Sequence, residues 1–113
     1  MKAVRGATVS LSNTEKDILA ATSELLNEIF SVNEINSSEI VSIIFTSTSD
    51  ITVSFPGKAV REMGLGHITV IDTLASNIEG DIPLCIRVML NVNTTKVLNH
   101  VYLGEAKKLR PDR

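Results

Sequence analysis

The stretch Cys85-Ile86-Arg87-Val88-Met89-Leu90-Asn91-Val92 decides how the rest of this chain is interpreted, because it has the composition of a strand and carries an arginine. Side chains alternate across a strand, so Arg87 shares its face with Cys85, Met89 and Asn91. That face does not have the composition of a solvated surface. A partly buried guanidinium cannot lose its charge, so it needs a fixed anion beside it. A ligand carboxylate or phosphate is one candidate for that anion.

A second arginine repeats this pattern near the start of the chain. Arg5 lies in Lys2-Ala3-Val4-Arg5-Gly6-Ala7-Thr8-Val9, which also has strand composition, and only alanine and valine share its face. Together the two arginines predict an anion-binding pocket. The alternative is that they pair with carboxylates of the same chain, such as Glu79 or Asp81, and bind no ligand. These two segments leave both interpretations open.

Composition limits the possible classes of protein. A chain of 113 residues with 43% hydrophobic content fits one domain, residues 1–113, with a modest core. Thirteen acidic and eleven basic residues give a net charge of -2, and no basic block marks a nucleic-acid surface. The single Cys85 excludes an internal disulfide, and no stretch approaches the roughly 20 apolar residues of a membrane span. With no signal peptide either, we expect a cytoplasmic protein with a small-molecule partner and no membrane partner.

The first half of the chain predicts a helix followed by a strand. Ser12 and Glu15 form a capping box, and apolar residues recur at helical spacing from there through Phe30. A polar connector leads into residues 40–46, whose β-branched and nearly continuous apolar composition predicts a buried strand.

The second half of the chain predicts a short helix and three more strands. Pro56 suits the first turn of a helix that Gly64 and Gly66 end. Further strands are expected at residues 68–71, 85–92 and 100–103, with a loop over residues 72–83. The order β-α-β-α-β-β-β predicts a single α/β or α+β domain.

Four blocks of sequence carry a more specific signal. They are Val4-Arg5-Gly6-Ala7-Thr8, Phe55-Pro56-Gly57-Lys58-Ala59-Val60-Arg61-Glu62, Cys85-Ile86-Arg87-Val88-Met89, and His100-Val101-Tyr102-Leu103 followed by Leu109-Arg110-Pro111-Asp112. In this order they resemble the monofunctional AroH-type chorismate mutases across the whole chain. Four ordered blocks are far more specific than any one of them. The resemblance implies a mixed sheet with two helices per chain, a homotrimer with a pseudo-α/β-barrel core, and active sites at subunit interfaces. It also implies conversion of chorismate to prephenate in the shikimate pathway, towards phenylalanine and tyrosine.

This reaction gives the arginines a role without an acid, a base, a metal or a cofactor. Chorismate is a dicarboxylate that rearranges within one molecule, so the protein need only orient it and stabilise developing charge. By resemblance, Arg87 is the cation beside the breaking ether bond. The other implied substrate-binding residues are Arg5 and Tyr102 at the carboxylates, and Phe55, Lys58, Arg61, Leu109 and Arg110 in the pocket wall and closing segments.

Simpler interpretations exist for several of these residues. A lone strand tyrosine such as Tyr102 is often a core residue with its hydroxyl at the rim. Lys58 and Arg61 also fit the solvated face of a short helix. Cys85 fits a small buried hydrophobe. The two histidines are too far apart in sequence to suggest a metal site, and none is predicted.

The chain departs from the family at one catalytic position. Counting back from Arg87 without a gap, the family's active-site glutamate falls on Ala75, and the family's pocket cysteine falls on Asp72. We expect a relocated carboxylate, with Asp72 contacting the substrate hydroxyl and balancing Arg87. Asp72 as a turn cap after the preceding strand is the structural alternative. The functional alternative to a chorismate mutase is a noncatalytic or substrate-shifted protein that keeps the dicarboxylate pocket.

Overall fold

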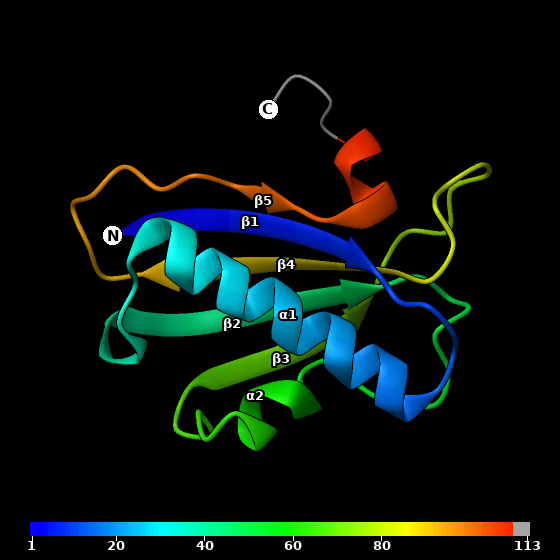
Figure 1. The fold of residues 1–113 in the computed structure, drawn as a ribbon, viewed down its shortest axis with the longest axis horizontal. Coiled ribbons are helices and arrows are strands. Elements are labelled where there is room, and N and C mark those ends of the chain that lie inside the picture. The colour runs from blue at the N-terminus through cyan, green and yellow to red at the C-terminus, as the bar shows by residue number, and fades with distance from the viewer. Residues whose placement is uncertain (110–113) are drawn as a thin grey trace.

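A single five-stranded mixed sheet organises the chain in the computed structural model, which describes residues 1–109 (Figure 1). The strands lie in the order β3-β2-β4-β1-β5. Their bounds are β1 Lys2–Val9, β2 Ile40–Ser47, β3 Thr69–Leu74, β4 Cys85–Val92 and β5 Val101–Tyr102. Two α-helices, α1 (Glu15–Asn33) and α2 (Lys58–Glu62), and two 3-10 helices, η1 (Ser37–Glu39) and η2 (Gly104–Leu109), complete the described elements.

The sheet combines parallel and antiparallel pairs. β4 lies at the centre and runs antiparallel to both β1 and β2, while β3 and β5 run parallel to β2 and β1 at the two edges. The predicted order of strands and helices is therefore confirmed, including the bounds of β4. The predicted strand 68–71 ended too early, because β3 continues through Leu74 and therefore contains Asp72.

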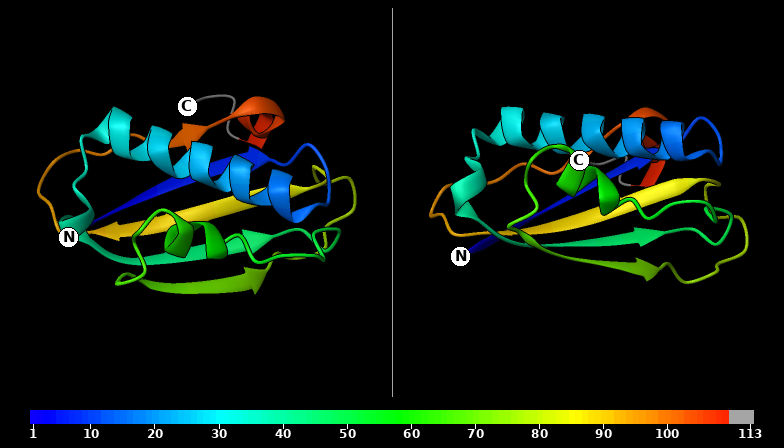
Figure 2. Two further views of the ribbon diagram at one scale, coloured as in Figure 1. Left: turned by 60° about the horizontal axis from the view of Figure 1, so that its bottom comes forward. Right: turned by 90° about the horizontal axis from the view of Figure 1, so that it is seen from below.

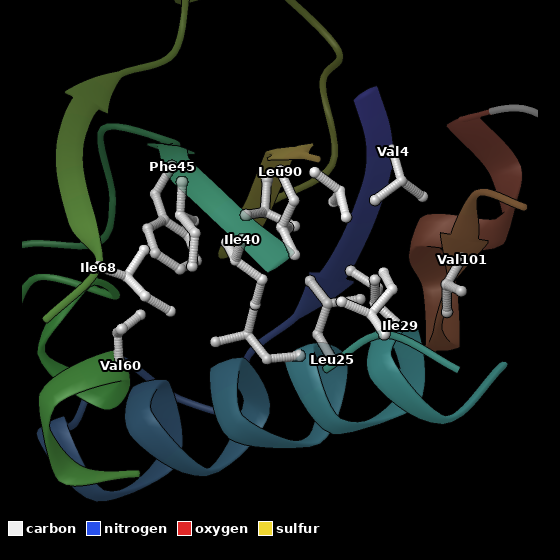
Figure 3. Packing of buried hydrophobic residues seen from close by; sticks show 14 of the residues in the cluster. Val4, Leu25, Ile29, Ile40, Phe45, Val60, Ile68, Leu90 and Val101 are labelled. Carbon is white, nitrogen blue, oxygen red and sulfur yellow. The ribbon is translucent and has the colours of Figure 1, made fainter. Parts of the chain in front are cut away.

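Both α-helices cover the same face of the sheet (Figure 2). α1 crosses the strands and supplies the fully buried Ile18, Leu25 and Ile29 to the core, and α2 adds Val60. These side chains meet inward-facing strand residues such as Phe45, as Figure 3 shows. The core is thus one layer between the helices and the sheet.

The predicted cap of α1 was wrong by two residues. Thr14 is the N-cap, and its side chain accepts a hydrogen bond from the backbone N–H of Asp17. The Ser12 hydroxyl instead donates to the Asp17 carboxylate at 2.7 Å. A hydroxyl lies at both positions in the sequence, so spacing alone did not separate them.

No helix in residues 1–109 combines the length and the apolar composition that crossing a membrane requires.

Within residues 1–109, no helix lies over the opposite face of the sheet (Figure 2). Ile71, which is 56% exposed, lies on this face, because its register partner is Ile44 and the residues on either side of Ile44 point into the core. Uncovered apolar surface on a sheet commonly marks an interface between chains. The homotrimer remains a prediction that this surface favours.

Candidate active site

Arg5 and Arg87 lie on the helix-free face of the sheet, on the neighbouring strands β1 and β4. Ala7 is the register partner of Arg87, and Arg5 lies two residues before Ala7 on the same strand. The residues next to them in the sequence, such as Val4 and Val88, are buried on the helix face. Both arginines are half-buried. Alternation along the two strands therefore brings the two cations to one face, as the predicted anion pocket requires.

Arg87 already has an anion beside it in the same chain. Its NH2 group donates to Asp81 Oδ1 at 2.9 Å, and the two side chains are 25% and 21% exposed. The Arg87 hydrogen bond, together with one from the backbone N–H of Ile82, lowers the pKa of the Asp81 carboxyl. For Arg87, the internal ion pair that the sequence left open is therefore present. No ion pair of Arg5 occurs within residues 1–109.

Tyr102 extends the row formed by Arg87 and Ala7 onto a third strand. Ala7 is the register partner of both residues, one in β4 and the other in β5, so all three lie on the helix-free face. The Tyr102 hydroxyl is buried and has no hydrogen-bond partner within residues 1–109. A buried tyrosine hydroxyl normally finds a partner. Its burial differs from the rim position that a simple core tyrosine would have.

Four of the other predicted site residues lie in a separate pocket of about 450 Å³ beside β3 and α2. The four residues are Phe55, Lys58, Arg61 and Asp72. The Lys58 ammonium group forms a 2.9 Å ion pair with Glu15, which raises the pKa of Lys58 and lowers that of Glu15. Phe55 is 71% exposed, which is unusual for a phenylalanine and leaves its ring free for a ligand or another chain.

Asp72 points to the helix side of the sheet, because its register partner is the buried Phe45. Its Oδ1 atom accepts a 2.9 Å hydrogen bond from the backbone N–H of Gly57. Burial raises the pKa of the Asp72 carboxyl, and the Gly57 N–H and the charge of Arg61 partly offset this effect. Asp72 therefore anchors the start of α2 to β3.

Two expectations for Asp72 need correction. It does not cap a turn, because β3 continues past it to Leu74. It does not balance Arg87 of its own chain either, because the two side chains point to opposite faces of the sheet. Ala75 lies just beyond the end of β3, and its N–H donates to Ser47 O at 2.9 Å.

The remaining predicted residues lie near the C-terminal end of the described chain. Leu109 is half-buried at the end of η2, and Arg110 lies outside the described residues.

Cys85 is buried, and burial raises the pKa of its thiol, as expected of a structural cysteine. No cluster of three or more histidine, cysteine, aspartate or glutamate side chains suited to a metal ion occurs within residues 1–109.

Two features of the site were not predicted from the sequence. His100 Nδ1 accepts a 3.0 Å hydrogen bond from the backbone N–H of Arg5, which ties the segment before β5 to the strand that carries this cation. Gly57 leaves the space beside its Cα that the Asp72 carboxylate occupies. The glycine in Pro56-Gly57-Lys58 was the only sequence signal for the second feature.

Comparison with known proteins identifies relatives of this chain. The chorismate mutase AroH of Bacillus subtilis strain 168 is 35% identical over 116 residues, covering 99% of this chain and 91% of that protein. Chorismate mutase AroH of Thermus thermophilus is 36% identical, covering 99% and 95%. The solved structure of a chorismate mutase from Clostridium thermocellum superposes with a TM-score of 0.93 at 40% identity, covering 96% of this chain and 99% of that one. Since the model of the chorismate mutase type I family also matches residues 1–113, the chain belongs to that family.

Proposed function

We propose that this chain is a cytoplasmic chorismate mutase, a single-domain isomerase that converts chorismate to prephenate for aromatic amino acid biosynthesis. The observation that carries the proposal is the row of Arg87, Ala7 and Tyr102, with Arg5 on the same face. Two cations and a buried hydroxyl with no hydrogen-bond partner within residues 1–109 suit a dicarboxylate. Membership of the chorismate mutase type I family supports the same activity.

The proposed mechanism needs no proton transfer. The ether C–O bond of chorismate breaks as a new C–C bond forms within the same molecule, and negative charge develops on the ether oxygen. Arg87 stabilises that charge, while Arg5 and Tyr102 hold the carboxylates and keep the side chain of the substrate over its ring. A guanidinium has five N–H donors, so the bond from Arg87 to Asp81 leaves donors for the substrate.

The second half of the proposed site comes from a neighbouring chain. Phe55, Lys58 and Arg61 surround a pocket beside β3, at the edge of the sheet, away from the row that contains Arg87. A homotrimer that places this pocket over the helix-free face of the next chain would complete one site from two chains. In that arrangement Asp72 reaches the substrate hydroxyl from the neighbouring chain, and Leu109 and Arg110 help to close the site.

The alternative function is a binding protein that has kept the dicarboxylate pocket without efficient turnover. Ala75, at the position of the family's active-site glutamate, is the observation that favours it. Mixing purified protein with chorismate separates the two, since the mutase consumes chorismate and forms prephenate. Saturable binding of chorismate without turnover would support the binding protein.

The two-chain site has its own test. Arg87→Met and Arg61→Ala should each inactivate the protein, because each removes a cation from one half of every site. Random mixing of the two variants in equal amounts, by unfolding and refolding together, should regenerate about a quarter of the sites in a trimer. A mixture as inactive as its two parents would show that both arginines serve the same chain's site.

A further inference from the structure

The ion pair between Arg87 and Asp81 is partly shielded and connected to the backbone. Asp81 Oδ1 accepts hydrogen bonds from Arg87 at 2.9 Å and from the N–H of Ile82 at 2.8 Å. With only 25% and 21% of the two side chains exposed, solvent screens this pair less than an ordinary surface ion pair. The Asp81 carboxylate is therefore held by its own backbone at a defined place beside the guanidinium.

The loop between β3 and β4 places Asp81 through a tight turn. The N–H of Asp81 donates to Ile78 O at 3.1 Å, and Gly80 has a φ of 81°, which favours glycine. At the far end of the loop, the Leu84 N–H donates to Asp50 and the Leu84 carbonyl accepts from Ser10, both at 2.9 Å. The Asp81 carboxylate thus lies on a loop whose end next to β4 is held by hydrogen bonds to Asp50 and Ser10.

Asp81 and Ala75 belong to the same loop, which begins after Leu74. Ala75 cannot supply a charge, and Asp72 points to the other face of the sheet. Within residues 1–109, the acidic residue that pairs with Arg87 is Asp81. The bond uses NH2 of Arg87, so it holds that end of the guanidinium while other N–H donors remain available.

We propose that Asp81 is the positioning residue of Arg87. From the middle of the loop, the Asp81 carboxylate supplies the counter-charge that position 75 lacks. This inference rests on the proposed mutase function and deepens it. Asp81 acts through Arg87. It orients the guanidinium towards the ether oxygen, and its negative charge balances the positive charge of Arg87.

Asp81→Asn tests the proposal most directly. It keeps the size of the side chain and an acceptor for the Ile82 N–H, and it removes the charge. We expect kcat to fall about ten- to a hundredfold, the range for loss of a charge-assisted hydrogen bond, with KM changed less than about threefold. Glu79→Gln is the matched control, because Glu79 is an exposed acid of the same loop. Unchanged or faster turnover in Asp81→Asn would overturn the proposal.

Adding Ala75→Glu to Asp81→Asn tests whether the two positions share one role. The double variant should recover at least about tenfold of the lost kcat, while Ala75→Glu alone should leave kcat the same or lower, because two carboxylates would then compete for one guanidinium. A large gain from Ala75→Glu alone would mean that Asp81 does not fill this role. This single change keeps Asp81, so it tests the proposal even if Asp81→Asn fails to fold.

A spectroscopic readout separates this inference from the proposed function. The side-chain N–H signals of Arg87 should be resolved in nitrogen-15 NMR spectra of the natural protein and should move or broaden in Asp81→Asn but not in Glu79→Gln. Natural protein that does not consume chorismate would refute the mutase function, and the Arg87 signals would still report on Asp81. Turnover in the natural protein with Arg87 signals unaffected by Asp81→Asn would refute only the role of Asp81.

Discussion

The Asp72 carboxylate occupies the space that a side chain at Gly57 would need. Gly57 has φ of -60° and ψ of -19°, a helical conformation that any residue adopts, so its backbone does not require glycine. A Cβ built there would overlap Asp72 Oδ2 and lie 2.9 Å from a methyl group of Val70. Gly57 and Asp72 are therefore sterically matched as well as hydrogen-bonded.

Gly57→Ala should destabilise the protein by about 1–2 kcal/mol, because the methyl group must displace Asp72 or Val70. The same change made together with Asp72→Ala should cost at least about 0.5 kcal/mol less, since one of the two clashes is gone. Urea unfolding of the natural protein, the two single variants and the double variant provides the measurement. Equal costs in both backgrounds would refute the steric match.

Asp72→Asn should increase the free energy of unfolding at neutral pH. The pKa of Asp72 is raised in the folded state by burial, so the folded protein binds the proton more tightly than the unfolded chain does, and stability falls as pH rises through that window. The advantage of Asn should therefore shrink as pH falls towards about 4, the ordinary aspartate pKa. Asp81 provides the opposite case: its pKa is lowered, so its stabilisation is present at neutral pH and is lost in acid. Unfolding curves at pH 7 and about pH 4 test the sign for Asp72, and curves extended below about pH 4 test the sign for Asp81.

Arg87→Met should reduce turnover by about a hundredfold or more while the fold survives, because the change keeps much of the side-chain length and removes the cation. Lys2→Met, at an exposed position of β1, is the control for loss of one positive charge. Chorismate consumption gives the rate, and the unfolding midpoint reports the fold. Near-normal turnover would eliminate the catalytic role of Arg87.

The rate should be nearly independent of pH between about 6 and 9, because the rearrangement transfers no proton and arginine stays charged. The lowered pKa of Asp81 keeps its carboxylate ionised throughout this range. Initial rates with stability checked at each pH provide the measurement. A steep bell-shaped profile would reveal an acid or base that the mechanism lacks.

Ile71→Lys should weaken self-association and lower activity together, because it puts a charge on the helix-free face of the sheet. The natural chain of 12.3 kDa should behave as a trimer in light scattering coupled to size exclusion. Lys16→Glu, at an exposed position of α1, is the control for a changed surface charge. A fully active monomer would refute sites shared between chains.

Much of the fold followed from local patterns. Strand composition predicted the bounds of β4, and period-two alternation predicted which residues share a face with Arg87 and with Arg5. Local patterns did not determine which face of the sheet carries Asp72. The face to which Asp72 points depends on whether β3 continues past it and on which residue of β2 lies opposite. This register is a property of the paired strands, so the sequence of one strand does not determine it.

The sequence did not determine which carboxylate pairs with Arg87, for a similar reason. Glu79 and Asp81 are separated by a single glycine in the sequence, and both are acidic. The positive φ at Gly80 and the hydrogen bond from the Asp81 N–H to Ile78 turn Asp81 towards β4. Only the tertiary path of the loop distinguishes the two carboxylates.

The position of β1 in the sheet has a consequence for how the protein folds. β1 lies between β4 and β5, so residues 9 and 85, and 6 and 101, must meet before its hydrogen bonds form. Closing such long loops is costly in entropy, and proteins dominated by non-local pairing fold slowly. During synthesis β1 must wait for β4 and β5, while the local hydrogen bonds of α1 can form earlier. The strand that carries Arg5 is therefore made before the two strands that enclose it, and during that delay its unpaired edges are exposed to aggregation.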